Sequence, residues 1–162
     1  MVVLSSGDKI MTLEEALRWR NRQVGPVVFT NGVFDILHPG HVDLLEKARA
    51  LGALLIVGVN DDDSARRLGK GEGRPVVRSD ARMRVIAALA ATDCVVSFSQ
   101  PTPAQTISAL RPDILVKGTD YEGQELPGHQ DVVSRGGQVV LIPLISGYSS
   151  TAIVERIRAQ TG

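Results

Sequence analysis

The sequence contains little cysteine, few aromatic residues and no excess of either charge, and each shortage excludes a class of protein. One cysteine, Cys94, is present among 162 residues, which excludes an intrachain disulfide and a metal site built from several cysteines. Aromatic residues make up 4% of the chain, too few for a platform that stacks single-stranded bases. Basic and acidic residues number 18 each, so the net charge is zero and no basic surface for nucleic acid is indicated. We therefore expect no nucleic-acid partner.

Long hydrophobic runs are also missing. No segment has the length and apolar character needed to cross a bilayer, and the N-terminal stretch lacks the charged start and apolar run of a signal peptide. We therefore expect a cytoplasmic protein without a membrane partner. Hydrophobic residues still make up 43% of the chain, which suits one compact domain with a core.

Short apolar runs alternate with amphipathic stretches, which is typical of β-α-β units around a parallel sheet. We expect an α/β fold with a Rossmann-like open parallel sheet of about five strands and helices on both faces, because the runs are apolar throughout. The expected single domain covers residues 1–162, with a helical extension over 1–25 and the core over 26–160. The expected strands are Val27–Thr30, Leu54–Val59, Cys94–Phe98, Ile114–Gly118 and Val139–Leu144.

Helices are expected between these strands and at both ends of the chain. Thr12 and Glu15 form a capping-box pattern that begins the first helix. Connections 60–79 and 119–129 are longer than a scaffold needs, and such loops are often functional. Cys94, inside an apolar strand, is interpreted as a small buried hydrophobe. The expected helices are Leu13–Asn21, His41–Ala50, Asp80–Ala90, Pro103–Leu110, Gln130–Arg135 and Thr151–Ala159.

The segment TNGVFDILHPGH, residues 30–41, joins the first expected strand to the helix that follows it. Pro39 suits the first position of that helix, so His38 and His41 lie three residues apart at its start and share a face. Free backbone N–H groups and the helix dipole favour an anion at this point. Two histidines with a glycine between them in this strand-turn-helix context favour a polyphosphate site.

Two other interpretations of the histidines remain open at this point. His38 can be an ordinary helix-capping residue with His41 partly buried in the helix. A metal site is a further alternative, but it needs more ligands, and His129 is the one other histidine of the chain. Phosphate motifs of the P-loop type and the G-x-G-x-x-G type are absent from the sequence, which disfavours kinase-type and dinucleotide redox chemistry.

The sequence resembles the cytidylyltransferase-like superfamily in two motifs. TNGVFDILHPGH resembles its N-G-x-F-D-x-L-H-x-G-H signature, and GYSSTAIVERI at 147–157 resembles the second signature that opens the final helix. The runs RLGKGEGRPV, RMRVIAAL, PDILVKGTDY and GGQVVLIPL are similar to the adenylyltransferases that join ATP to D-glycero-β-D-manno-heptose 1-phosphate. The resemblance covers residues 27–157. This chain departs from it at Thr119, where the family usually has glycine, and at Ala152, where it usually has asparagine.

The resemblance implies transfer of AMP from ATP to the sugar 1-phosphate, which gives ADP-heptose and pyrophosphate for the lipopolysaccharide core. It also implies Mg²⁺ carried mainly on the ATP phosphates with few protein ligands, and a separate heptose kinase of the same pathway is compatible with it. A homo-oligomer is expected from the general frequency of symmetric assemblies. The alternatives are a cytidylyl- or adenylyltransferase for another small phosphate, such as glycerol 3-phosphate, and a nucleotide-binding module without catalysis.

Such a transfer needs no enzyme nucleophile, because the attacking phosphate is already largely ionised at neutral pH. Positioning and charge neutralisation are then the expected sources of catalysis. The residues implied as catalytic are His38, His41, Lys70 and Arg82. The residues implied in nucleotide binding are Asn31, Gly32, Phe34, Gly40, His41, Lys117, Gly118, Asp120, Ser149, Ser150 and Thr151, and those implied in substrate binding are Asp35, Asn60 and Arg74.

Several of these residues also have a plain structural interpretation. Lys70 can be a solvated loop lysine, and Arg82 a surface charge on a helix. Asp35 can face the sugar or Mg²⁺, or it can hydrogen-bond the turn. The run of three aspartates at 61–63 more often caps a loop than contacts a ligand.

Overall fold

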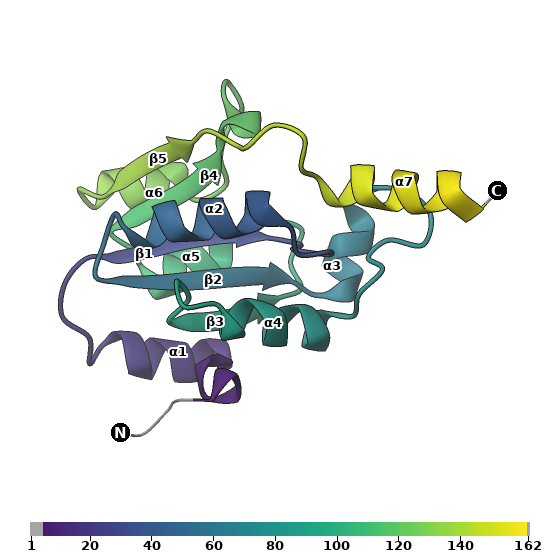
Figure 1. The fold of residues 1–162 in the computed structure, drawn as a ribbon. Coiled ribbons are helices and arrows are strands. Elements are labelled where there is room, and N and C mark those ends of the chain that lie inside the picture. The colour runs from purple at the N-terminus through teal and green to yellow at the C-terminus, as the bar shows by residue number, and fades with distance from the viewer. Residues whose placement is uncertain (1–4, 162) are drawn as a thin grey trace.

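The computed structural model describes residues 5–161 and contains a five-stranded, all-parallel sheet in the order β3-β2-β1-β4-β5 (Figure 1). Residues 1–4 and 162, the two ends of the expected domain, lie outside the described residues. The Rossmann-like α/β fold expected from the alternating apolar runs is confirmed. The strands are β1 (Val27–Gly32), β2 (Leu54–Asn60), β3 (Cys94–Phe98), β4 (Ile114–Gly118) and β5 (Gln138–Ile142).

The helices cover both faces of the sheet. Two short 3₁₀ helices, η1 (Ser6–Lys9) and η2 (Thr119–Tyr121), accompany them. The α-helices are α1 (Leu13–Arg20), α2 (Pro39–Arg49), α3 (Asp62–Arg67), α4 (Ser79–Ala88), α5 (Ala104–Leu110), α6 (His129–Ser134) and α7 (Ser150–Thr161).

The observed boundaries lie within two residues of the expected ones, and one α-helix was not expected. Connection 60–79 contains the helix α3, which begins where the Asp61 carboxylate accepts a hydrogen bond from the Ser64 backbone N–H. This helix is too short to show an apolar period in the sequence. Strand β5 ends at Ile142 rather than Leu144, and Pro143, which has no N–H to donate to a ladder, follows it directly. The aspartate run is thus a helix cap, as its structural interpretation predicted.

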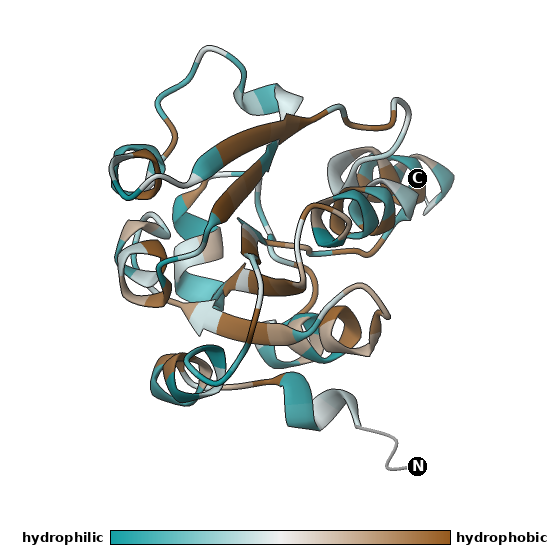
Figure 2. Cartoon of the chain, turned by 90° about the vertical axis from the view of Figure 1, so that its left-hand side faces the viewer, coloured by the Kyte–Doolittle hydropathy of each residue, from teal (hydrophilic) through white to brown (hydrophobic). Residues whose placement is uncertain are grey.

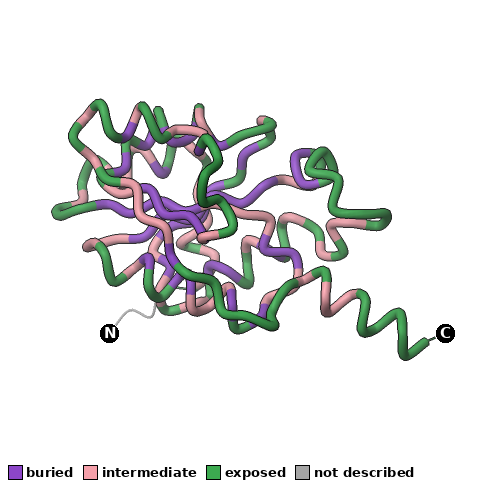
Figure 3. The backbone as a smooth tube through the Cα atoms, turned by 90° about the horizontal axis from the view of Figure 1, so that it is seen from above, coloured by how far each residue is buried: buried purple, intermediate pink, exposed green. Residues whose placement is uncertain are grey.

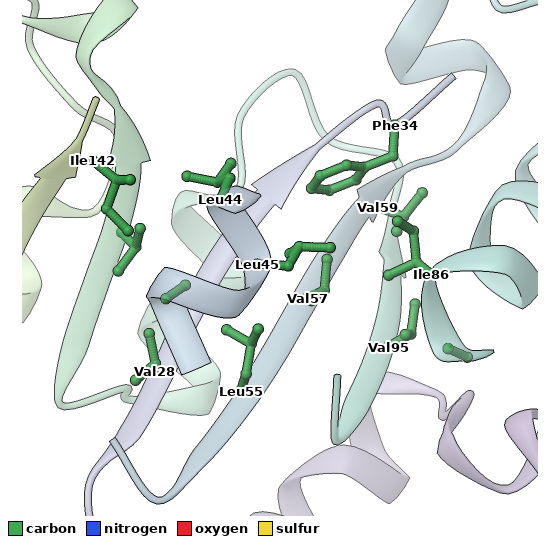
Figure 4. Packing of buried hydrophobic residues seen from close by; sticks show 13 residues of the cluster. Val28, Phe34, Leu44, Leu45, Leu55, Val57, Val59, Ile86, Val95 and Ile142 are labelled. Atoms are coloured by element: carbon green, nitrogen blue, oxygen red, sulfur yellow. The ribbon is translucent and has the colours of Figure 1, made fainter. Parts of the chain in front are cut away.

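Side-chain alternation along the strands divides the core between the two faces of the sheet. In β1, Val28 packs with Leu45 of α2, whereas Val27 and Phe29 point to the opposite face and pack with Leu110 of α5. Figure 4 shows the first cluster, with the leucines of α2 facing the strand side chains. In Figure 2 the apolar residues lie along the strands and on the inner sides of the helices. Helices α2 and α4 therefore cover one face, and α1, α5 and α6 cover the other.

The two ends of the described chain differ in how they pack. The capping box at Thr12 and Glu15 is present as expected, and Ala16 of α1 is fully buried in the second cluster. Helix α7 contains no buried residue and extends from the carboxyl end of the sheet (Figures 1 and 3).

Cys94 is buried, as predicted, and burial raises the pKa of its thiol to about 12. Within residues 5–161, no helix has the length and apolar character to span a membrane.

Candidate active site

A cavity of about 230 Å³ lies beyond the carboxyl ends of β1 and β4. Its walls come from the end of β1 with the β1–α2 turn (residues 33–38) and the start of α2, the loop between α3 and α4, the end of β4 with the segment after it, and the β5–α7 connection with the start of α7. The loop between α3 and α4, residues 68–78, is called the Lys70 loop. Ligands of open α/β sheets bind at this edge. The predicted site residues that line the cavity are Asn31, Gly32, Phe34, Asp35, His38, Gly40, His41, Lys70, Arg74, Lys117, Gly118, Asp120, Ser149, Ser150 and Thr151.

The β1–α2 turn presents the two histidines as a stacked pair. Phe34 adopts the left-handed region with φ of 50°, a conformation that side chains other than glycine rarely take. Its ring then meets the edge of His41, with 5.2 Å between ring centroids. The rings of His38 and His41 stack with centroids 3.7 Å apart. A Cβ on Gly40 would lie 3.0 Å from the His38 ring, so glycine at this position leaves room for the pair.

Each of the two histidines keeps one buried ring nitrogen that no described residue satisfies. The Nδ1 atoms of His38 and His41 are buried and have no hydrogen-bond partner among the described residues. Burial, together with the nearby His38 and Lys70, lowers the pKa of His41 to about 4, while Asp35 acts in the opposite direction. Burial also lowers the pKa of His38. The pair is therefore uncharged at neutral pH without a ligand, and a nearby anion would favour protonation.

Lys117 brings a buried amine to the carboxyl end of β4. Its side chain lies in the cavity wall, with Nζ 3.3 Å from the backbone oxygen of Asn31 and 4.8 Å from the ring centroid of Tyr121. Burial lowers the pKa of Lys117 to about 8, although Asp120 raises it. An ammonium has three donors, and the described residues supply one acceptor for them, so Lys117 retains capacity for a ligand.

The start of α7 is joined to the β1–α2 turn, which brings the two sequence motifs together. The Ser150 hydroxyl donates to the Ile36 backbone oxygen at 3.1 Å and accepts from the Ile36 N–H at 3.4 Å. The Ser149 hydroxyl accepts from the Ala152 N–H at 3.0 Å and so caps the helix. These contacts place the first turn of α7 at the cavity beside the first turn of α2. In the first turn of α2, Pro39 has no N–H and the His41 N–H donates to the His38 oxygen, which leaves the N–H of Gly40 without a partner among the described residues. In the first turn of α7, no described residue accepts from the N–H groups of Ser150 and Thr151, which remain free.

Asp35 lines the cavity but its carboxylate is already engaged. It accepts hydrogen bonds from Arg74 Nε at 2.6 Å and from the N–H groups of Val76 and Val77 at 3.0 and 2.9 Å. Burial raises the pKa of Asp35, but these hydrogen bonds and the Arg74 charge hold it below its usual value. The hydrogen bonds that the sequence interpretation offered as the alternative role of Asp35 are thus present. Arg74, expected to bind substrate, is Asp35's ion-pair partner.

Arg82 and Asn60 do not line the cavity, and their expected ligand contacts are replaced by contacts within the protein. The Arg82 side chain is fully buried. It donates to the backbone oxygens of Val33, Asn60 and Val77 and to the Asp62 carboxylate. The Asn60 side chain donates to the Ser64 hydroxyl. The interpretation of Arg82 as a surface charge is also wrong, because the guanidinium is a buried structural group.

Several cavity residues were not predicted from the sequence. Both tyrosines of the chain, Tyr121 and Tyr148, lie in the cavity wall, and Tyr148 stands 6.4 Å from His38 between ring centroids. The chain has few aromatic residues, and both of its tyrosines lie beside recognised motifs. That position was the signal available in the sequence. The other unpredicted lining residues are Thr30, Val33, Leu44, Leu144 and Ile145, and nothing in their type distinguishes them from core residues.

The side chains of residues 5–161 do not fit a metal held by the protein itself. They contain no group of three or more histidine, cysteine, aspartate or glutamate side chains arranged to hold an ion. Mg²⁺ prefers carboxylate oxygens, and both oxygens of Asp35, the buried carboxylate of the cavity, are hydrogen-bonded to protein donors.

Comparison with known sequences supports the two-motif pattern. The sequence model of the family described as cytidylyltransferase-like matches residues 29–156. The Bifunctional protein HldE of Shewanella sediminis is 51% identical over 154 residues, which is 95% of this chain and 32% of that protein. The protein of the same name from Pseudomonas paraeruginosa is 55% identical over 132 residues, which is 82% of this chain and 28% of that protein. The chain thus spans about a third of the length of these curated relatives.

Solved structures show the same architecture. A lipopolysaccharide core biosynthesis protein from Thermoplasma volcanium superposes with a TM-score of 0.63 at 29% identity, over 78% of this chain and 100% of that chain. A pantoate-beta-alanine ligase from Francisella tularensis superposes with a TM-score of 0.60 over 94% of this chain and 78% of that chain. At 15% identity the second likeness concerns the fold alone.

Replacement of Arg82 by methionine should destabilise the protein by about 3–5 kcal/mol, because it leaves one buried and two part-buried backbone oxygens and Asp62 without their shared donor. Urea unfolding measures this difference. The matched control is Arg78→Met at the cap of the same helix, where the arginine is 83% exposed and the loss should be within about 0.5 kcal/mol. Similar small losses for both variants would contradict the structural role of Arg82.

The ring resonances of His41 should titrate with a midpoint near pH 4, since burial lowers its pKa to about 4. Because the unfolded chain has a histidine pKa of about 6.5, stability contributed by neutral His41 is present above pH 6.5 and is lost as the pH falls toward 4. Nuclear magnetic resonance of the imidazole protons measures the midpoint, with assignment from His38→Gln and His129→Gln. A midpoint near 6.5 in the folded protein would refute the burial argument.

Proposed function

This chain belongs to the cytidylyltransferase-like family, and we propose that it transfers AMP from ATP to D-glycero-β-D-manno-heptose 1-phosphate. The observation that carries the proposal is the stacked pair of His38 and His41, which lines one cavity together with the start of α7. The choice of heptose is supported by the KGTDY and GRPV segments and by the relatives that match most of the chain.

The proposed reaction joins an oxygen of the sugar phosphate to the α-phosphorus of ATP and breaks the bond to the β-phosphate, so that pyrophosphate leaves. The attacking oxygen is already ionised, which matches a cavity lined by donors rather than by a nucleophile and a base. His38 and His41, with the Gly40 N–H at the start of α2, would stabilise charge on the α- and β-phosphates. The uncharged resting state of the pair allows it to take up a proton as the polyphosphate binds.

The start of α7 is proposed to bind the β- and γ-phosphates. The side chains of Ser149 and Ser150 are engaged in the helix cap and in the contact with Ile36. The donors left for the phosphates are therefore the Thr151 hydroxyl and the first N–H groups of the helix. Pyrophosphate would then depart between the two helix starts, each of which supplies a partial positive charge.

Two lysines are proposed to supply the full positive charges. Lys70 reaches the cavity from its loop, and its charge acts on both His41 and Lys117. Lys117, with Gly118 and Asp120, would line the nucleoside end of the site, where Tyr121 offers an aromatic face to the ligand. Mg²⁺ would enter bound to the ATP phosphates, because Asp35, the buried carboxylate of the cavity, is engaged with protein donors.

Substrate identity is tested by measuring pyrophosphate release from purified protein with Mg²⁺, ATP or CTP, and either the heptose 1-phosphate or glycerol 3-phosphate. Release is expected with ATP and the heptose 1-phosphate. Release with CTP but not ATP would replace the adenylyl assignment with a cytidylyl one. Release with ATP and glycerol 3-phosphate alone would remove the heptose assignment, and no release with any pair would favour a binding module without catalysis.

Replacement of His41 by alanine should lower kcat on the order of 100-fold or more, the usual cost of losing a donor to transition-state charge. Steady-state pyrophosphate release measures the effect, and thermal unfolding checks that the variant is folded. His129→Ala is the matched control, because His129 begins α6 and does not line the cavity. A folded His41→Ala variant with a near-normal kcat would remove His41 from the proposed mechanism.

A further inference from the structure

The Lys70 loop has little support around Lys70 itself. Gly69, Gly71 and Gly73 all have positive φ angles, and a Cβ at any of them would meet no atom within 4 Å. The loop therefore passes through open space on both sides of Lys70. The backbone oxygen of Glu72 accepts a hydrogen bond from Arg158 of α7 at 3.4 Å, a long contact at an exposed position.

The end of the same loop is fixed firmly to the β1–α2 turn. Asp35 accepts from Arg74 and from the N–H groups of Val76 and Val77, and the side chains of the Asp35–Arg74 pair are 2% and 8% exposed. The Val77 backbone oxygen accepts from Arg82 Nε at 2.8 Å. Arg82 also donates to Val33 in the turn at 2.6 Å. The backbone N–H of Val77 is thus bonded to Asp35 and its backbone oxygen to Arg82, and both of these side chains are joined to the β1–α2 turn.

We propose that Asp35 is a positioning residue that acts through Lys70: it ties the end of the Lys70 loop to the turn that carries the histidines and thereby holds Lys70 at the phosphates. This inference rests on the proposed function. A carboxylate offers about four acceptor sites, and protein donors occupy three of them here. Asp35 therefore has little capacity left to bind a substrate, but it links two walls of the cavity directly.

The position of the Lys70 charge matters to the other residues of the cavity. The charge of Lys70 acts on His41 and on Lys117, so its position affects two other groups of the cavity. A displacement of about 1 Å in a positioned group can lower a rate on the order of 100-fold. Loss of the Asp35 anchor should therefore reduce kcat through Lys70, while the remaining walls of the cavity continue to bind ATP.

The test is a double-mutant cycle with Asp35→Asn, Lys70→Ala and the double variant, measured by kcat and KM for ATP. We expect Asp35→Asn to lower kcat on the order of 10- to 100-fold in the wild-type background. The same substitution should change kcat less than about 2-fold when Lys70 is already alanine, because residues acting through one another are not additive. Full multiplication of the two effects, or unchanged kinetics for either single variant, overturns the proposal.

Two further variants serve as an alternative test and as a control. Arg74→Gln removes the ion pair but keeps the carboxylate and its two backbone bonds, and it should show the same dependence on Lys70 if Asp35→Asn fails to fold. Asp131→Asn is the matched control, because Asp131 pairs with Arg135 on α6 at 3.0 Å and does not line the cavity. It should leave kcat and KM unchanged, and a reduction equal to that of Asp35→Asn would overturn the proposal.

A readout without catalysis separates this inference from the proposed function. Trypsin cleaves after Lys70, and release of the loop in Asp35→Asn should raise the rate of cleavage at that bond at least several-fold under native conditions. Wild-type protein that releases no pyrophosphate, combined with faster cleavage in Asp35→Asn, would contradict the proposed function and leave the anchor standing. Equal cleavage rates in both proteins would overturn the anchor.

Discussion

The buried guanidinium of Arg82 is the contact on which the geometry of the cavity depends. It joins the β1–α2 turn, the end of β2, the cap region of α3 and α4, and the end of the Lys70 loop through four acceptors. Asn60 is the last residue of β2, and the β1–α2 turn and the end of the Lys70 loop are irregular backbone that no sheet ladder fixes. A planar group with five donors can satisfy several such segments at once, which a lysine cannot do.

The cavity is arranged for an anion by neutral and cationic groups of different origin. The histidines are kept uncharged by burial, the lysines lie on separate segments, and two helices begin at the same place. Asp35, the buried carboxylate in this wall, is neutralised by Arg74 and by two backbone N–H groups. The negative charge of Asp35 is thus paired within the protein at the end of the Lys70 loop, whereas the buried nitrogens of the two histidines beside it have no partner among the described residues.

The fold and most of the candidate site could be predicted because they follow from local patterns. The strand over 114–118 and the capping box at Thr12 are present as expected, since apolar runs and capping pairs act over a few residues. The two motifs likewise predicted the meeting of His41 and Thr151 in one cavity. The helix α3 and the end of β5 were missed, because a six-residue helix has no period and a single proline decides a boundary.

The sequence by itself determined the sheet and the two motifs that line the cavity, because these depend on residue type and short spacing. Only the tertiary structure decided which charged residues line the cavity and which are paired within the protein. Asp35 and Arg74 are 39 positions apart and Arg82 and Val33 are 49 apart, and their pairing depends on how two loops fold over one sheet edge. A buried partner satisfies a charge as fully as a ligand does, and residue type alone does not distinguish the two.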